Sequence, residues 1–187
     1  MNEDPQLYDY LPSIDRPRIS WPGGARVAVW VAPNIEHYEY DPPASPVRSA
    51  TPRPAPDLNW LTLRDYGNRA GVWRMMEVMD RYQVRGSVSL NVGVCDHYPE
   101  IIEACVERGW ELFSHGVYNT RYLYGMDADQ EREVIADVKA TILRASGQPL
   151  SGWLSPALSN TTRTMDLLAE ADVMYTCDLM QIGRAHV

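Results

Sequence analysis

The sequence predicts an α/β protein built on a parallel sheet. Short apolar runs alternate along the chain with segments whose apolar residues recur at helical spacing. Strands that alternate with helices favour a parallel sheet with right-handed crossovers. The chain has 187 residues, of which 45% are apolar and 22% are charged, so it is long enough to form one domain with a buried core.

Five apolar runs predict the strands of this sheet. The first is nearly continuous from Arg26 to Ala32, as expected for a fully buried strand. The later strands are expected at Ser87–Val92, Trp110–Ser114, Leu150–Leu154 and Val173–Thr176. Each run is followed by a polar stretch, so the carboxyl end of each strand can be located in the sequence.

Helices are expected between these strands at residues 72–82, 99–109, 127–147 and 160–171. Pro99 suits the first turn of its helix, and Asp127 with Gln130 resembles a capping box. The alternation fits either an open doubly wound sheet or a barrel. No Gly-x-Gly-x-x-Gly follows the first strand, which weakens the dinucleotide-binding form of the open sheet.

Residues 1–180 are expected to form one domain, interrupted by a proline-rich loop at 42–56. Six prolines in that loop exclude a helix interior or a central strand, and the loop is either a solvated linker or the cover of a site. Residues 181–187 end in Ile-Gly-Arg-Ala-His-Val, which is one translation of a common sequencing adapter. We therefore expect a non-native tail on a chain truncated near Met180.

Composition excludes several classes of function. The net charge of -8 disfavours binding to nucleic acid or to an anionic membrane. No apolar run approaches the roughly 18 residues of a spanning helix, and Met1–Arg18 lacks the pattern of a secretory signal. The widely spaced Cys95, Cys105 and Cys177 fit reduced thiols. A cytoplasmic protein is expected.

Ligands of parallel α/β folds bind at the carboxyl ends of the strands. The candidate site residues therefore follow the predicted strands: Glu36, His37, Asn91, His115, Asn119, Trp153, Ser155 and Asp178. Imidazole nitrogens with carboxylate or amide oxygens suit a divalent metal such as zinc, cobalt or nickel, which would activate water. Without metal the same groups would form a hydrogen-bonded acid–base set. His97 is interpreted as a local capping or packing residue.

Three short segments carry a resemblance to a known family: Asn-Ile-Glu-His-Tyr at 34–38, His-Gly-Val-Tyr-Asn at 115–119, and Gly-Trp-Leu-Ser-Pro at 152–156. With the order of elements from Arg26 to Asp178, they resemble the polysaccharide deacetylase (NodB-like) family. The resemblance implies a distorted parallel (β/α) barrel, which the expected truncation leaves incomplete at its C-terminus.

The resemblance also implies roles for these residues. Glu36 falls at the general base, and His37, His115 and Asn119 fall at the metal ligands, where the family has Asp-His-His. The arginine that orients the family's base has no clear counterpart, although Trp153 lies near its place. The chain looks most similar to the cytoplasmic, allantoinase-like branch, which includes cofactor-independent amidohydrolases.

We therefore expect a hydrolase of non-peptide carbon–nitrogen bonds that acts on a small amide or ureide. Substrate contacts are expected from Asn91, Trp153, Ser155 and Asp178. A metal-dependent deacetylase of N-acetylated sugars is an alternative, and a non-catalytic barrel that binds a small ligand is another. The expected partner is a small molecule, with a homo-oligomer possible.

Overall fold

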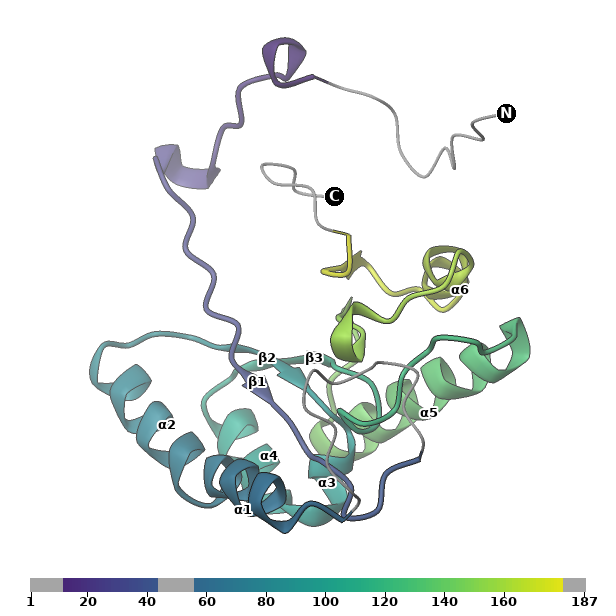
Figure 1. Ribbon diagram of the computed structural model, residues 1–187. Coiled ribbons are helices and arrows are strands. Elements are labelled where there is room, and N and C mark those ends of the chain that lie inside the picture. The colour runs from purple at the N-terminus through teal and green to yellow at the C-terminus, as the bar shows by residue number, and fades with distance from the viewer. Residues whose placement is uncertain (1–11, 44–55, 180–187) are drawn as a thin grey trace. The chain divides into compact units, whose positions relative to one another are not determined.

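The computed structural model describes residues 12–43 and 56–179, and the chain divides into two units at Trp30. The described part of the first unit holds two short 3-10 helices, η1 (Ser13–Asp15) and η2 (Pro22–Gly24). The second unit, from Val31 onward, contains the sheet and the helices labelled in Figure 1. Within the described ranges, no helix is both long enough and apolar enough to cross a membrane.

The sheet has five parallel strands in strictly sequential order. They are β1 (Asn34–Ile35), β2 (Ser87–Leu90), β3 (Glu111–Ser114), β4 (Gly152–Trp153) and β5 (Tyr175–Thr176). In a doubly wound sheet the strand order reverses at a switch point, whereas in a β/α barrel each strand pairs with the next one along the chain. The observed order therefore decides for the distorted barrel fold and against the open sheet.

Six α-helices are assigned in the described ranges. They are α1 (Leu58–Tyr66), α2 (Val72–Arg81), α3 (Gly93–His97), α4 (Pro99–Glu107), α5 (Ala128–Ser146) and α6 (Thr164–Glu170). A π-helical turn, η3 (Gly67–Gly71), joins α1 to α2, and a 3-10 turn, η4 (Pro156–Leu158), follows β4. The four helices expected from the sequence are confirmed; α1 and α3 were not expected.

The longest helix, α5, shows how closely local sequence can define an element. Asp127 accepts hydrogen bonds from the backbone N–H groups of Asp129 and Gln130, and the Gln130 side chain accepts one from the backbone of Asp127. This confirms the predicted capping box. The helix ends at Gly147, whose φ of 72° lies in the left-handed region that favours glycine.

The first strand lies further along the chain than predicted. The run Arg26–Ala32 is not assigned as a strand, and Val27 and Val29 are 72% and 83% exposed. Pairing with β2 begins at Val31, whose carbonyl accepts a hydrogen bond from the Ser87 N–H at 3.0 Å. An apolar run indicates a preference for burial, but the hydrogen-bonded partner decides which of its residues become strand.

The hydrophobic core includes residues of β2 and β3. Val88, Leu90 and Leu112 are at most 1% exposed, and they pack in one cluster with Trp153 at the end of β4. Residues at the centre of β2 and β3 are thus packed into the core. The residues that follow the strands therefore have a firm scaffold.

Candidate active site

A cavity of about 610 Å³ lies at the carboxyl end of β1. Its walls come from the segment after β1, from α1, from the end of α3 and from the loop after β3: Glu36, His37, Tyr38, Glu39, Tyr40, Asp41, Leu61, Thr62, Arg64, Asp65, Asn68, Arg69, His97, Tyr98 and Tyr118. The position agrees with the general rule for ligand sites in parallel α/β folds.

Glu36 is the centre of a hydrogen-bonded group at this end of the sheet. The Tyr38 hydroxyl donates to Glu36 Oε2 at 2.5 Å, and the Asn119 amide nitrogen donates to the same oxygen at 3.0 Å. The other oxygen, Oε1, lies 3.4 Å from His115 Nε2. The Glu36 side chain is 26% exposed, so its carboxylate is held in place and still reaches solvent.

The orientation of His115 follows from its other ring nitrogen. Nδ1 lies 3.0 Å from the carbonyl oxygen of Leu154, which can only accept a hydrogen bond, so Nδ1 carries the donated proton. Nε2 is then the ring nitrogen that faces Glu36. Gly116 makes the turn that follows, with φ of 70°, and a Cβ there would lie 2.8 Å from the Pro156 ring.

These contacts determine the charge of Glu36. The hydrogen bond to His115 is the largest cause that lowers the pKa of Glu36, and the Tyr38 hydroxyl adds to it, while burial opposes both. Burial and the bond to Glu36 raise the pKa of Tyr38 to about 12. Glu36 is therefore an ionised carboxylate at neutral pH, and Tyr38 is a neutral donor to it.

His37 projects away from this group. Its ring stacks on His97, with ring centroids 4.1 Å apart and planes inclined by 18°. Burial is the largest cause that lowers the pKa of His37, followed by the charge of His97. Adjacent residues of an extended chain point to opposite sides, while residues two apart share a side. That alternation explains why Glu36 and Tyr38 meet and why His37 faces elsewhere.

Asn91 has a different role from the one expected. It is fully buried; its Oδ1 accepts a hydrogen bond from the His37 backbone N–H at 3.0 Å, and its Nδ2 donates to the carbonyl oxygen of His115. A side chain with 0% exposure does not reach a ligand in the cavity. Asn91 thus ties the segment after β1 to the end of β3, and it is not among the residues that line the cavity.

Trp153, Ser155 and Asp178 form a buried chain of hydrogen bonds. The indole N–H of Trp153 donates to Ser155 Oγ at 2.9 Å, and that hydroxyl donates to Asp178 Oδ2 at 2.6 Å. Asp178 Oδ1 also accepts from the Ser155 backbone N–H at 2.6 Å, and burial raises the pKa of Asp178. All three are at most 5% exposed, and none is among the residues that line the cavity.

The residues gathered here do not fit the expected metal site. His37 lies against His97, not beside His115. Asn119 turns its amide nitrogen toward the Glu36 carboxylate, because its oxygen would repel that anion. The buried Oδ1 of Asn119 has no hydrogen-bond partner among the described residues. Within residues 12–43 and 56–179, no three His, Cys, Asp or Glu side chains are grouped as ligands. The donor set is one carboxylate and one imidazole.

Three residues that line the cavity were not predicted as site residues from the sequence. Tyr38 could have been identified from its position two residues after Glu36, on the same side of an extended chain. His97 lines the cavity at the end of α3 rather than serving only as a cap. Arg64 lies on α1, a helix that the sequence pattern did not reveal, and no motif marks it.

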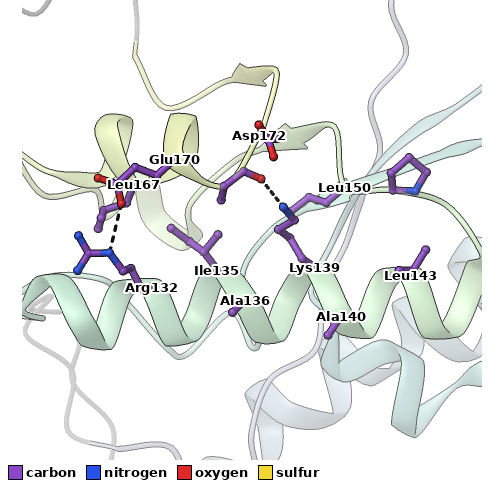
Figure 2. Close-up of a pocket in the computed structure, with 12 residues that line it drawn as sticks. Arg132, Ile135, Ala136, Lys139, Ala140, Leu143, Leu150, Leu167, Glu170 and Asp172 are labelled. Carbon is purple, nitrogen blue, oxygen red and sulfur yellow. Dashed lines mark hydrogen bonds and ion pairs between the residues drawn. The ribbon is translucent and has the colours of Figure 1, made fainter.

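A second cavity of about 610 Å³ lies between α5 and α6 (Figure 2). Ile135, Leu150 and Leu167 contribute to its apolar wall, and Arg132 bridges the two helices through Glu170 at 3.2 Å. Pro149 and Leu150 precede β4, so this groove lies toward the amino ends of the strands. In β/α barrels that end carries stability rather than catalysis. The cavity beside Glu36 is therefore the candidate active site.

The sequence pattern of the polysaccharide deacetylase family matches residues 53–176. The chain belongs to this family. No curated protein sequence matches the chain. The segment that matches the polysaccharide deacetylase family includes Asn119 but not Glu36.

Solved structures of similar fold agree with this assignment. A probable polysaccharide deacetylase from Pseudomonas aeruginosa PAO1 is 27% identical, with a TM-score of 0.75 over 94% of this chain and 60% of that one. PuuE allantoinase is 24% identical, with a TM-score of 0.74 over 91% and 61%. A Mycobacterium smegmatis putative polysaccharide deacetylase is 25% identical, with a TM-score of 0.66 over 87% and 54%. The chain thus spans about 60% of the length of the first two structures.

Proposed function

We propose that this protein hydrolyses the carbon–nitrogen bond of a small amide or ureide, with Glu36 as the general base and without a metal ion. The observation that carries the proposal is the ionised, partly exposed Glu36 carboxylate, which is fixed by Tyr38, Asn119 and His115 at the edge of a cavity. A positioned carboxylate within reach of water is the requirement for general base catalysis of hydrolysis.

The chemistry proceeds in two proton transfers. Glu36 accepts a proton from water as the water oxygen forms a bond to the amide carbon. The same proton then passes to the leaving nitrogen as the carbon–nitrogen bond breaks, which gives an acid and an amine and restores the carboxylate. His115 faces Glu36 through Nε2, and the hydrogen bond between them holds the carboxylate in position through both steps.

The proposed mechanism uses no metal ion because too few side chains at the site are placed to act as metal ligands. A hydrolytic zinc site commonly has three protein ligands and an open position. Here Glu36 and His115 are the two side chains in place to act as metal ligands, and His37 is stacked on His97 instead. Asn119 presents its amide nitrogen, which donates a hydrogen bond and does not bind a metal ion. The general base therefore has to activate water by hydrogen bonding alone.

Three features favour a small substrate. The cavity volume of about 610 Å³ is in the range of pockets that take small molecules. Six aromatic or imidazole side chains line it: His37, Tyr38, Tyr40, His97, Tyr98 and Tyr118. Such walls suit a compact planar molecule, and PuuE allantoinase, whose name denotes a ureide-hydrolysing enzyme, is among the structures of similar fold.

A substrate panel with a Glu36→Gln variant tests this function. Purified protein should release amine or ammonia from small ureides and amides, and Glu36→Gln should lower kcat by at least about 100-fold because the base is lost. Gln keeps the volume and a hydrogen-bond acceptor, so its thermal stability controls for folding. Activity of Glu36→Gln within about threefold of the original would refute Glu36 as the base.

The family name favours a second function, metal-dependent deacetylation of N-acetylated sugars. Chitooligosaccharides in the same panel distinguish the two, because deacetylation releases acetate. Acetate release that depends on added zinc or cobalt, with no hydrolysis of ureides, would replace our proposal by this one. Ligand-induced thermal stabilisation without turnover of any compound would favour a barrel that only binds its ligand.

A further inference from the structure

The Arg64 side chain lines the candidate active-site cavity, and its guanidinium forms no ion pair or hydrogen bond with any residue in the described ranges. Its guanidinium lies over the ring of Tyr38, 3.6 Å from the centroid, and 4.8 Å from the centroid of Trp60. Trp60 and Arg64 are four residues apart on α1 and therefore share a face of the helix. Two aromatic rings hold the cation, and its N–H donors remain available.

The acidic residues near Arg64 have other partners. Glu39 accepts from Arg121 at 2.7 Å and from the Thr120 hydroxyl at 2.7 Å. Asp65 is paired with Arg69 and accepts from the Tyr98 hydroxyl at 2.6 Å. Asp41 is exposed at the rim, where solvent screens its charge. No carboxylate in the described part of the cavity forms an ion pair with Arg64, although the charge of Arg64 acts on the nearby Glu36.

Arg64 is also connected to the catalytic carboxylate. It lies on Tyr38, whose hydroxyl donates to Glu36 Oε2 at 2.5 Å, and it is close enough to contribute to the lowering of the Glu36 pKa. It lines a second hollow of about 280 Å³ that Glu36 and Tyr38 also line. A substrate group bound by Arg64 would thus lie beside the carbon–nitrogen bond that Glu36 is proposed to hydrolyse.

We propose that Arg64 is an anion-binding, specificity-determining residue, and that the substrate is an amide or ureide that carries a carboxylate group. This inference rests on the hydrolase function proposed above and narrows its substrate class. The planar fork of a guanidinium matches a carboxylate with two parallel hydrogen bonds, and stacking on rings leaves that fork free at its edge. A neutral substrate of the same shape would leave the guanidinium unpaired.

Two ligands of nearly identical shape test the proposal: N-carbamoylglycine, which has a carboxylate, and N-carbamoylglycinamide, which has a neutral amide in its place. Calorimetry measures their affinities without relying on turnover, and kcat/KM is measured where hydrolysis occurs. The protein should prefer the carboxylate by about 10- to 100-fold, the range of a charge-assisted pair. Arg64→Gln should bring that ratio to about 1, mainly through the affinity or KM for the carboxylate.

Control variants separate recognition from folding. Arg74→Gln removes a similar arginine that donates to Tyr66 outside the cavity, and it should leave the ratio unchanged. Arg64→Lys keeps the charge without the fork and should retain part of the preference. If Arg64→Gln weakens both ligands equally, or if the original protein shows no preference, Arg64 is only a packing residue and the proposal is wrong.

The two proposals fail in different ways. Carboxylate preference that is lost in Arg64→Gln, with no hydrolysis of any compound, would support Arg64 as an anion site and overturn the hydrolase. Hydrolysis of both ligands at equal kcat/KM, abolished by Glu36→Gln, would support the hydrolase and overturn the role of Arg64.

Discussion

Replacement of Asn91 by alanine should destabilise the fold and separate the ends of two strands. The variant loses the hydrogen bonds to the His37 N–H and to the His115 carbonyl, both made by a side chain with 0% exposure. Each such bond contributes about 1 kcal/mol, and a buried group left without a partner costs about 1–3 kcal/mol. The expected loss in the free energy of unfolding is therefore about 2–4 kcal/mol.

Thermal unfolding followed by circular dichroism measures this loss. At about 2–4 °C per kcal/mol for a chain of this size, Tm should fall by about 5–15 °C. Asn59→Ala is the matched control, because Asn59 is exposed on α1, and its effect should stay within about 0.5 kcal/mol. A Tm for Asn91→Ala within about 2 °C of the original would refute the positioning role.

Further predictions concern other buried groups. Glu131 is fully buried on α5 and accepts from the hydroxyls of Thr161 and Thr164, so urea titration of Glu131→Ala should show a loss of about 2–4 kcal/mol, while exposed Glu133→Ala should show almost none. Because burial raises the pKa of Asp178, its contribution to stability is present at low pH and is lost as pH rises through the folded pKa. Asp178→Asn should therefore raise Tm at pH 7 relative to the original protein. A difference in Tm between variant and original that is the same at pH 4 and at pH 7 would contradict this. Tyr38→Phe removes a donor that lowers the pKa of Glu36, so the acid limb of the kcat/KM profile should move to higher pH. A limb that does not move would show that another group titrates.

The fold could be predicted largely from local sequence. The alternation of strands and helices predicted the parallel sheet, and the capping box at Asp127 predicted where α5 begins. The first strand was misplaced because an apolar run indicates a preference for burial but not the residue at which pairing begins. Helix α1 was missed because Leu58–Tyr66 presents no apolar face to the core and buries none of its residues.

The candidate site was predictable in position but not in arrangement. Ligands of parallel α/β folds bind at the carboxyl ends of the strands, and this rule predicted that Glu36, His115 and Asn119 lie close together, as they do. Sequence could not show that His37 points the other way, since that depends on the direction of each side chain after β1. The sequence also could not show that the side-chain amide of Asn91 forms hydrogen bonds with backbone groups. Arg64 reaches the site only through tertiary packing of α1 against Tyr38.

The central claim is that Glu36 hydrolyses a carbon–nitrogen bond without a metal ion. The most direct test is the rate of ureide hydrolysis before and after dialysis against a chelator, with the metal content of each sample measured by mass spectrometry. We predict an unchanged rate in protein that holds far less than one metal per chain, and loss of that rate in Glu36→Gln. A rate that falls with the metal content and returns on addition of zinc, cobalt or nickel would contradict the claim.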